Sequence, residues 1–246
     1  MTYAPFKMMP NAAIPDDIAP SIADGGSIHP TPFEQKNAIL TNAALQAEAG
    51  FVRMENGDYL VAMTCPMPGV TKAMIDWWFW WHPQENVRYR MWYPGEHERN
   101  GYGRKDAAYF NVPDMPAFQP NTQYPVERIG KQKMPLVIDF LTAEQFGFDS
   151  ADMAKGNIAA IVCGHVGAYH NLVQHTEMAH IFFQREDGLF LVSRFWLGKR
   201  LKNPLIRHCM LTDDTAGGMA AHCCVEYRNL SRLLPTLYRK NVICGE

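Results

Sequence analysis

Residues 215–240 read TAGGMAAHCCVEYRNLSRLLPTLYRK, and their apolar residues recur at intervals of three and four. This spacing is typical of one face of an α-helix and predicts an amphipathic helix near the C-terminal end. The inner face of that helix also carries His222 and Glu226. A carboxylate taken out of water is destabilising unless it is paired or bound to a cation. The two residues are therefore either a buried hydrogen-bonded pair or half of a metal site, since side chains four apart can bind one ion.

The composition is that of an ordinary globular protein, with 246 residues, 47% hydrophobic residues and a formal net charge of −2. Such a chain can bury a sizeable core. No basic patch indicates a nucleic acid or an anionic membrane as partner, and no apolar run is long enough to span a bilayer. The first residues lack the apolar core of a signal peptide, and the six cysteines form no C-x-x-C pair. These features favour reduced thiols in a cytoplasmic protein.

The N-terminal region is predicted to be an arm followed by a helix. Prolines recur throughout residues 1–32, which predicts an extended arm that lies on the body or on a partner subunit. A homodimer is therefore possible. Residues 33–49 have the pattern of a helix that ends at Gly50. We divide the chain into residues 1–50, the arm and this helix, and residues 51–246, the main domain.

Tryptophans and a long loop mark the next part of the chain. Asn56 and Gly57 predict a hairpin turn, and a loop from residue 66 leads to a helix of residues 71–81 that Thr71 caps. Four tryptophans in that helix cannot all be core on one face, so we expect some of them to line a cavity or an interface. Residues 87–93 alternate as in a strand and place Tyr89 on its drier face. Residues 94–120 read as a long loop of the kind that forms lids and site walls.

The second half reads as an antiparallel meander with strands at residues 122–129, 134–141, 158–164, 178–185 and 189–197. Asp187 and Gly188 are predicted to form a two-residue turn, which places His180 opposite Phe195 on one face of the sheet. Residues 204–214 connect this sheet to the terminal helix. The sequence therefore predicts an α+β protein with a curved antiparallel sheet around a long C-terminal helix.

The positions of five histidines indicate whether each is a candidate for the site. His165, His170, His175 and His180 recur every five residues, a spacing that fits neither a helix nor a strand. We interpret the first three as loop or surface residues and retain only His180, which lies on a predicted strand. His82 ends the tryptophan helix before a proline, and a packed or capping histidine is the preferred interpretation.

Four segments, in the same order and within residues 66–238, resemble the diacetylphloroglucinol hydrolase and phloretin hydrolase family. They are WWFWWHPQENVRYRMWYPGEH, VERIG, MAHIFFQREDGLFLVSRFWLG and HCCVEYRNLSRLLPTLY. The resemblance implies a helix-grip fold of the birch-pollen-allergen and START type, so that residues 51–246 would be a metal-binding catalytic domain. It also implies hydrolysis of the carbon–carbon bond between an acyl group and a polyhydroxylated aromatic ring, with a small acylphenol as substrate.

The resemblance implies a zinc site made of His97, Glu127, His222 and Glu226. One helix would supply two ligands four residues apart, and two separate sheet or loop segments would supply the others. Two imidazoles and two carboxylates suit Zn²⁺, although they also accept iron or manganese.

The resemblance further implies a set of residues around the substrate. Tyr89 and Asn100 would hold ring hydroxyls, and His180 would carry a proton. Phe195 stands where we expect some relatives to have a tyrosine, which would remove one hydrogen bond to the ring. Trp78 and the neighbouring tryptophans would form an aromatic wall for a flat substrate.

Two other functions remain compatible with the sequence. One is a different metalloenzyme on the same scaffold, either an iron-dependent oxygenase or an ester or lactone hydrolase. The other is a carrier that binds an aromatic or polyketide ligand without chemistry.

Overall fold

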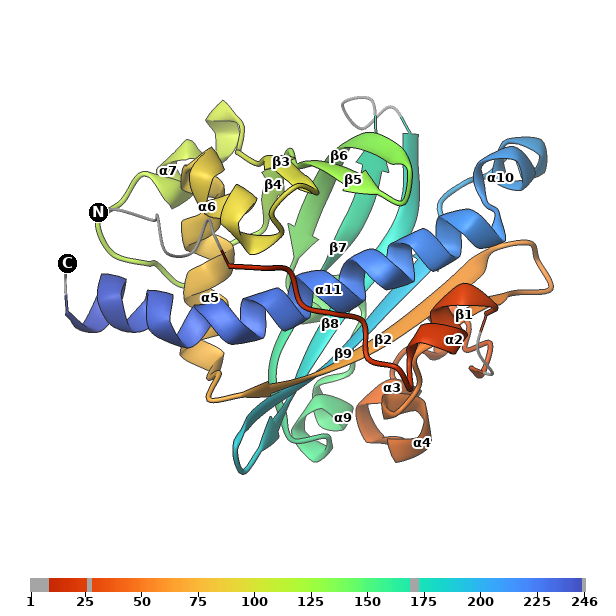
Figure 1. Ribbon diagram of the computed structural model, residues 1–246, viewed down its shortest axis with the longest axis horizontal. Coiled ribbons are helices and arrows are strands. Elements are labelled where there is room, and N and C mark those ends of the chain that lie inside the picture. The colour runs from red at the N-terminus through yellow and green to blue at the C-terminus, as the bar shows by residue number, and fades with distance from the viewer. Residues whose placement is uncertain (1–8, 26–27, 169–172, 245–246) are drawn as a thin grey trace.

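A computed structural model of the chain describes residues 9–25, 28–168 and 173–244. Within these residues, nine strands form an antiparallel sheet in the order β1-β2-β9-β8-β7-β6-β5-β3, with β4 paired to β6. The long helix α11 (Asp213–Tyr238) crosses one face of this sheet (Figure 1). The predicted combination of an antiparallel sheet with a long C-terminal helix is confirmed.

Helix α11 begins where the Thr212 hydroxyl accepts a hydrogen bond from the Thr215 amide. Two aspartates in its first turn favour the positive end of the helix dipole. A Cβ atom on Gly218 would lie 3.3 Å from the Cα atom of Gly130, so glycine at this position allows the turn between β5 and β6 to approach the helix closely. After Tyr238 the chain continues as one π-helical turn (Arg239–Ile243).

The first hairpin follows the prediction, and the helix after it begins as expected. Strands β1 (Gly50–Arg53) and β2 (Tyr59–Pro68) flank the turn at Asn56 and Gly57. Strand β2 continues through Pro68, so the predicted loop from residue 66 is shorter than expected. The Thr71 hydroxyl then accepts a hydrogen bond from the Met74 amide and caps α5 (Lys72–Trp81).

All four tryptophans of α5 are buried, because the helix is covered on more than one side. Trp77 packs edge-on against Tyr238 at the end of α11, with ring centroids 5.4 Å apart. Trp80 donates from its indole nitrogen to the carbonyl oxygen of Tyr109. Every residue from Trp77 to Trp81 is therefore buried or partly buried, which the amphipathic pattern of a surface helix does not anticipate.

The predicted strand at residues 87–93 is wrong, because these residues form α6 (Asn86–Trp92). A run of six or seven residues is too short for its alternation to distinguish a strand from a helix. In the helix, Tyr89 and Trp92 are three residues apart and share the inner face, with ring centroids 6.0 Å apart. A 3₁₀ turn, η2 (His82–Gln84), joins α5 to α6.

The predicted helix at residues 33–49 is broken into three short pieces. They are η1 (Phe33–Gln35), α3 (Ala38–Thr41) and α4 (Ala43–Gln46). Asn42 has an extended backbone conformation, and its side chain caps α4, which interrupts the helix. The predicted loop at residues 94–120 contains β3 (His97–Arg99), η3 (Arg104–Asp106) and α7 (Ala107–Phe110).

The predicted strands of the second half are all present, with the first one divided at Tyr124 and Pro125. They are β4 (Asn121–Gln123), β5 (Val126–Ile129), β6 (Gln132–Leu141), β7 (Ile158–Ala168), β8 (Val173–Arg185) and β9 (Gly188–Leu197). The short helices α8 (Ala143–Phe146) and α9 (Ser150–Lys155) lie between β6 and β7. A further helix, α10 (Pro204–Met210), lies in the predicted connection to α11.

The predicted turn between β8 and β9 is displaced by one residue. Arg185 pairs with Gly188, so the two loop residues are Glu186 and Asp187. His180 consequently pairs with Ser193 instead of Phe195. Gly188 has a φ of +151°, and a Cβ atom there would lie 2.4 Å from the carbonyl oxygen of Met67. Glycine is thus required by the close contact with β2 rather than by the turn.

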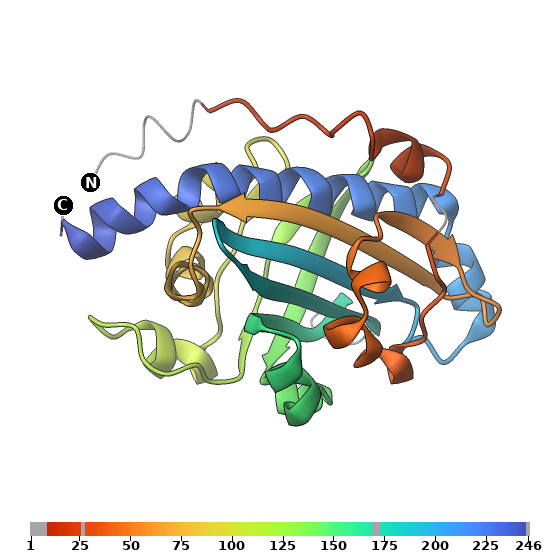
Figure 2. The ribbon, with the colours of Figure 1, turned by 90° about the horizontal axis from the view of Figure 1, so that it is seen from below.

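Each face of the sheet is covered by a different set of helices. The face toward α11 also receives α5 and α6 and contains the larger hydrophobic cluster. The opposite face packs against α3, α4, α8 and α9 (Figure 2). Among the described residues, no helix is both long and apolar enough to cross a membrane.

The N-terminal arm lies along α11 of the same chain. The amide of Ala12 donates to the Asn229 side chain at 2.7 Å, and Arg232 donates to the carbonyl oxygen of Pro10. The arm then forms the short helix α2 (Ala19–Ala23), whose Ile22 is buried. The arm is predicted to lie either on the body or on a partner subunit. Its described residues lie on the body of the same chain.

The contact at Gly188 gives a prediction about stability. We expect Gly188→Ala to lower the free energy of unfolding by about 2 kcal/mol or more, because both its backbone conformation and its distance from β2 exclude a methyl group. Urea unfolding measures the change. Gly101→Ala is the control, since a Cβ atom there meets no atom within 4 Å. Equal midpoints for the two variants would contradict the prediction.

Candidate metal centre and pocket

Four ionisable side chains meet where β3, β5 and α11 adjoin. His97 on β3 pairs in register with Glu127 on β5. His222 and Glu226 are one turn apart on α11. All four are buried, with exposed fractions of 3% to 8%. The structure therefore brings together the four residues that the sequence analysis grouped.

The separations of the ligand atoms fit one metal ion. The Nε2 atoms of His97 and His222 are 3.2 Å apart. The Glu226 carboxylate lies 3.5 Å from the first and 3.8 Å from the second of these nitrogens, and the Glu127 carboxylate lies 3.5 Å from His222. Ligands at about 2.0–2.2 Å from a tetrahedral ion are separated from one another by about 3.3–3.6 Å. His97, His222 and Glu226 form a group that could hold an ion, and Glu127 adjoins it.

Burial drives each of these groups toward its neutral form. It raises the pKa of Glu127 to about 7 and raises that of Glu226 well above its ordinary value. It lowers the pKa of His222 to about 4 and that of His97 well below its ordinary value. Two neutral imidazoles then face each other through their Nε2 atoms beside two carboxyl groups. A divalent cation would compensate the carboxylates and bind both imidazoles, so the donor set fits a metal.

Contacts around the four side chains fix their orientation. The Nδ1 atom of His97 lies 3.3 Å from the carbonyl oxygen of Tyr89, which leaves Nε2 free to face the cluster. The Tyr89 ring stacks on His97 with centroids 4.1 Å apart, and its hydroxyl donates to Glu127. Trp92 donates to the backbone carbonyl oxygen of Glu226. Helix α6 therefore supports ligands from all three elements, as outer residues commonly do at metal sites.

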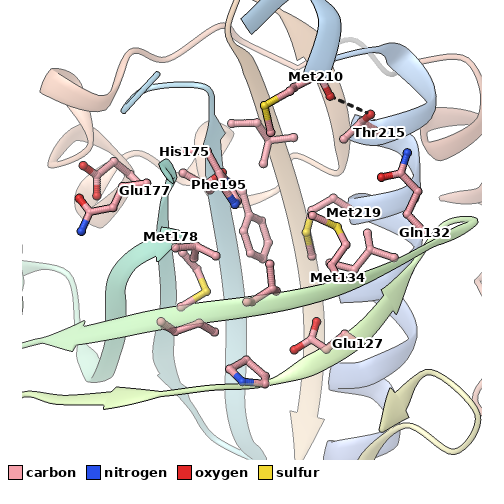
Figure 3. A pocket seen from close by; sticks show the side chains of 18 of the residues that line it. Glu127, Gln132, Met134, His175, Glu177, Met178, Phe195, Met210, Thr215 and Met219 are labelled. Atoms are coloured by element: carbon pink, nitrogen blue, oxygen red, sulfur yellow. Dashed lines mark hydrogen bonds between the residues drawn. The ribbon is translucent and has the colours of Figure 1, made fainter. Parts of the chain in front are cut away.

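A cavity of about 1450 Å³ adjoins this cluster, and Glu127, Glu226 and Tyr89 are part of its wall. Alternate residues of β6 line the cavity, and their order along the strand gives the direction from one end of the cavity to the other. They are Gln132, Met134, Leu136, Ile138 and Phe140. Gln132 lies toward α10 and the start of α11 (Figure 3), and Glu127 pairs with Met134. Phe140 lies at the opposite end. The carboxylates therefore occupy the middle of a long pocket.

The end of the pocket near Phe140 contains a hydrogen-bonded group of three side chains. The Asn100 amide nitrogen lies 2.8 Å from the side-chain oxygen of Gln123 and 3.1 Å from Nε2 of His82. His82 donates from Nδ1 to the carbonyl oxygen of Trp78, which leaves Nε2 as the acceptor for Asn100. His82 is thus a packed and capping histidine, as expected, and it also orients Asn100. No sequence motif identified Gln123, which becomes a neighbour of Asn100 through the antiparallel bridge that joins Tyr102 to Gln123.

His180 and Phe195 line the same pocket in edge-to-face contact, with ring centroids 5.4 Å apart. The Nδ1 atom of His180 lies 2.8 Å from the Ser193 hydroxyl. Tyr227, which the sequence analysis did not single out, contacts the His180 ring at 4.8 Å and also lines the pocket. The described residues provide no hydrogen-bond partner for the Tyr227 hydroxyl. The pKa of Tyr227 is raised well above its ordinary value, mainly by burial and secondly by the Glu226 carboxylate, so the hydroxyl stays protonated.

Three expectations about the pocket require correction. Trp78 does not line the pocket, because it is fully buried and stacks on His82 with ring centroids 5.1 Å apart. The aromatic residues that line the pocket include Phe79 and Trp92, and none of the four α5 tryptophans is among them. His165 and His175 are not loop residues, since they lie on β7 and β8. His170 lies outside the described residues.

Comparison with known proteins gives one family and three relatives. The model of the DAPG hydrolase PhiG domain family matches residues 31–239. The phloretin hydrolase of Eubacterium ramulus is 30% identical over 90% of this chain and 86% of that protein. The 2,4-diacetylphloroglucinol hydrolase of Pseudomonas protegens is 27% identical over 93% of this chain and 76% of its own length. The enzyme of the same name from a Pseudomonas species is also 27% identical, over 93% and 79%.

Solved structures resemble the chain only weakly. Protein CV1439 from Chromobacterium violaceum has a TM-score of 0.38 and 7% identity, over 72% of this chain and 97% of that one.

The buried His82 predicts a pH dependence of stability. Burial lowers the pKa of His82 to about 3, whereas an unfolded histidine titrates near 6.5. Between these values the unfolded chain binds more protons, so stability falls as the pH falls. His82→Phe retains an aromatic ring against Trp78 and Tyr89. From pH 7 to pH 5 we expect it to lose about 2 kcal/mol less stability than the unmodified protein. Urea unfolding at both pH values tests this, and equal losses would contradict it.

Proposed function

Because the chain belongs to the DAPG hydrolase family, and is therefore a hydrolase of carbon–carbon bonds, we propose that it removes an acyl group from a polyhydroxylated aromatic ring in a reaction that depends on zinc. The observation that carries this proposal is the buried set of two imidazoles and two carboxylates in the wall of a large pocket. The names of its relatives supply the class of substrate.

The proposed ligands are His97, Glu127, His222 and Glu226, and Zn²⁺ suits both their types and their separations. When bound there, Zn²⁺ would polarise the acyl carbonyl group and help to supply hydroxide at neutral pH. The residues of the chain would bind the ring, orient it and move the proton.

The ring would bind at the end of the pocket that contains Asn100 and Tyr89. Cleavage of an aryl–acyl bond leaves an electron pair on a ring carbon, and hydroxyl groups on that ring accept it as a phenolate or enolate. Asn100 is held by His82 and Gln123 and can bond to a ring hydroxyl without first being ordered. The Tyr89 hydroxyl, which donates to Glu127, adjoins the same space. Phe195 provides an apolar contact.

His180 is the proposed proton carrier for the ring carbon. Its Nδ1 atom is bonded to Ser193, and Nε2 has no hydrogen-bond partner among the described residues. Burial lowers the pKa of His180 to about 3, so the ring is neutral before the reaction and able to accept a proton from water. It would then donate that proton to the departing ring.

Tyr227 is the proposed hydrogen-bond donor to the acyl oxygen. Its hydroxyl stays protonated and adjoins the carboxylates of the cluster, which contribute to its raised pKa. A donor already in position stabilises an oxygen on which negative charge develops.

The proposal extends to the fold type and to the setting. The sheet with α11 across its inner face supports a helix-grip fold for residues 51–246. All six cysteines are free thiols, and four are buried, which supports a reducing cytoplasmic location. A homodimer stays a prediction.

Metal analysis combined with an activity assay tests the central proposal. We expect about one zinc ion per chain and release of phloroglucinol and a carboxylic acid from acylphloroglucinols, both lost with a chelator. Glu226→Gln should lose the ion and at least about 100-fold of kcat/KM. Glu98→Gln is the control, because Glu98 adjoins His97 but is exposed and paired with Lys133. A protein that is fully active without metal would refute the proposal, and a requirement for dioxygen would indicate an oxygenase.

The role of Tyr227 has a separate kinetic test. We expect Tyr227→Phe to lower kcat about 100-fold with little change in KM, because the lost hydrogen bond acts mainly in the transition state. Zinc content should be unchanged, since the phenol is not a proposed ligand. An increase in KM at constant kcat would instead assign Tyr227 to ground-state binding.

A further inference from the structure

The proposed metal centre separates two hollows of the protein. Glu127 and Glu226 line the main cavity. A second pocket, of about 550 Å³, is lined by His97 and by Arg128, the residue that follows Glu127 on β5. Successive side chains of a strand point to opposite faces, and no described residue lines both pockets. The centre therefore has an inner side toward the main cavity and an outer side toward the second pocket.

Tyr93 covers the two imidazoles of the centre on the outer side. Its ring centroid lies 4.9 Å from that of His222 and 5.6 Å from that of His97. Tyr93 is half-buried and does not line the main cavity, and residues 94–96, which follow it, line the second pocket. The His97 and His222 side chains beneath the ring have exposed fractions of only 0% and 3%. The ring therefore lies between solvent and two of the proposed ligands.

The backbone after Tyr93 turns back on itself and fixes the position of the ring. The Tyr93 carbonyl oxygen accepts hydrogen bonds from the amides of Glu96 and His97, at 3.1 and 3.0 Å. Gly95 has a φ of +91°, a left-handed conformation that favours glycine and allows the chain to make this turn. The covering ring and the proposed ligand His97 therefore belong to one short hydrogen-bonded segment.

The N-terminal arm holds the same turn against α11. The Asn11 side chain donates to the carbonyl oxygen of Pro94 at 3.0 Å and accepts from the Asn229 side chain at 3.1 Å. Asn229 is buried on α11, three residues after Glu226, and also accepts from the Ala12 amide. Asn11, Pro94 and Asn229 do not line the main cavity, so contact with a substrate does not account for these bonds.

The two sides of the centre differ in what separates them from solvent. On the inner side the carboxylates lie in the middle of a long pocket that substrate and water must be able to enter. On the outer side one half-exposed ring lies over the imidazoles. A bound ion is exchanged when water or another ligand reaches it, and the apolar shell around a metal site controls that access. Tyr93 is therefore the side chain that must move for exchange through the outer side.

We infer that Tyr93 is the outer cover of the metal centre and that, held down by the bond between Asn11 and Pro94, it sets the rate at which the ion is exchanged with solvent. The inference rests on the proposed function only because it requires that the centre binds a metal. It gives the arm and the turn after α6 a part in retaining the ion, although neither contacts the substrate.

Stopped-flow release of zinc to excess pyridylazoresorcinol, a coloured chelator, tests the cover with the zinc-loaded full chain. We expect Tyr93→Ala to release zinc about tenfold faster, in keeping with the loss of two aromatic ring contacts. Tyr93→Phe retains the ring and should release zinc at the rate of the unmodified protein. Asn11→Ala loses the bond to Pro94 and should release zinc about threefold faster. Phe118→Ala is the control without effect, since Phe118 is an exposed aromatic residue that lines neither pocket.

Equilibrium competition with the same chelator distinguishes a cover from a support for the ligands. A cover obstructs uptake and release alike, so the zinc affinity of Tyr93→Ala should change far less than the roughly 10–100-fold that follows loss of a residue that orients a ligand. An affinity loss of that size, an unchanged release rate in Tyr93→Ala, or faster release from Tyr93→Phe overturns the inference.

The same measurements separate failure of the cover from failure of the proposed function. A protein that binds zinc and releases it faster after Tyr93→Ala, but cleaves no acylphloroglucinol, supports the cover and overturns the proposed reaction. A protein that takes up no zinc overturns both.

Discussion

The burial of four ionisable side chains at one junction is the constraint on which the rest of the structure depends. His97, Glu127, His222 and Glu226 lie among aromatic and aliphatic residues with little contact with solvent. Each is driven toward neutrality by that environment, and the two carboxyl groups oppose each other's ionisation. Only a cation, or protons, can stabilise them together. The fold therefore buries four ionisable groups that are unfavourable together and that a bound cation would stabilise.

Helix α6 shows how the surrounding structure maintains this arrangement. Tyr89 stacks on one imidazole and donates to a carboxylate, while Trp92 bonds to the backbone of α11. His82 in turn stacks between Tyr89 and Trp78. The tryptophans of α5 thus contribute to the site indirectly, as rigid support for the residues that face the pocket. Close packing of this kind limits the rotamers available to each ring.

Long regular patterns in the sequence predict most of the fold correctly, whereas short local patterns do not. The stripe on α11 and the alternation in the later strands extend over many residues, and both predictions are correct. Residues 87–93 are too few to distinguish the two-residue period of a strand from the 3.6-residue period of a helix. The sequence places Gly188 in a turn, although a contact with β2, more than a hundred residues earlier, requires the glycine. The four clustered residues could be grouped through the family resemblance, whereas Gln123 and Tyr227 depend on strand pairing and helix rotation that no local pattern reveals.

The position of α11 after all the described strands has a consequence for biosynthesis. Every described strand precedes Thr212 in the sequence, so the sheet can be complete on the ribosome before its covering helix has emerged. Until then the apolar residues of β2 on the inner face, including Val61 and Met63, lack the helix that covers them. His97 and His222 are 125 residues apart, so the centre cannot assemble before that last helix docks. Metal capture would then report that α11 has docked, and a chain truncated before α11 would present the quality-control machinery with an exposed hydrophobic surface.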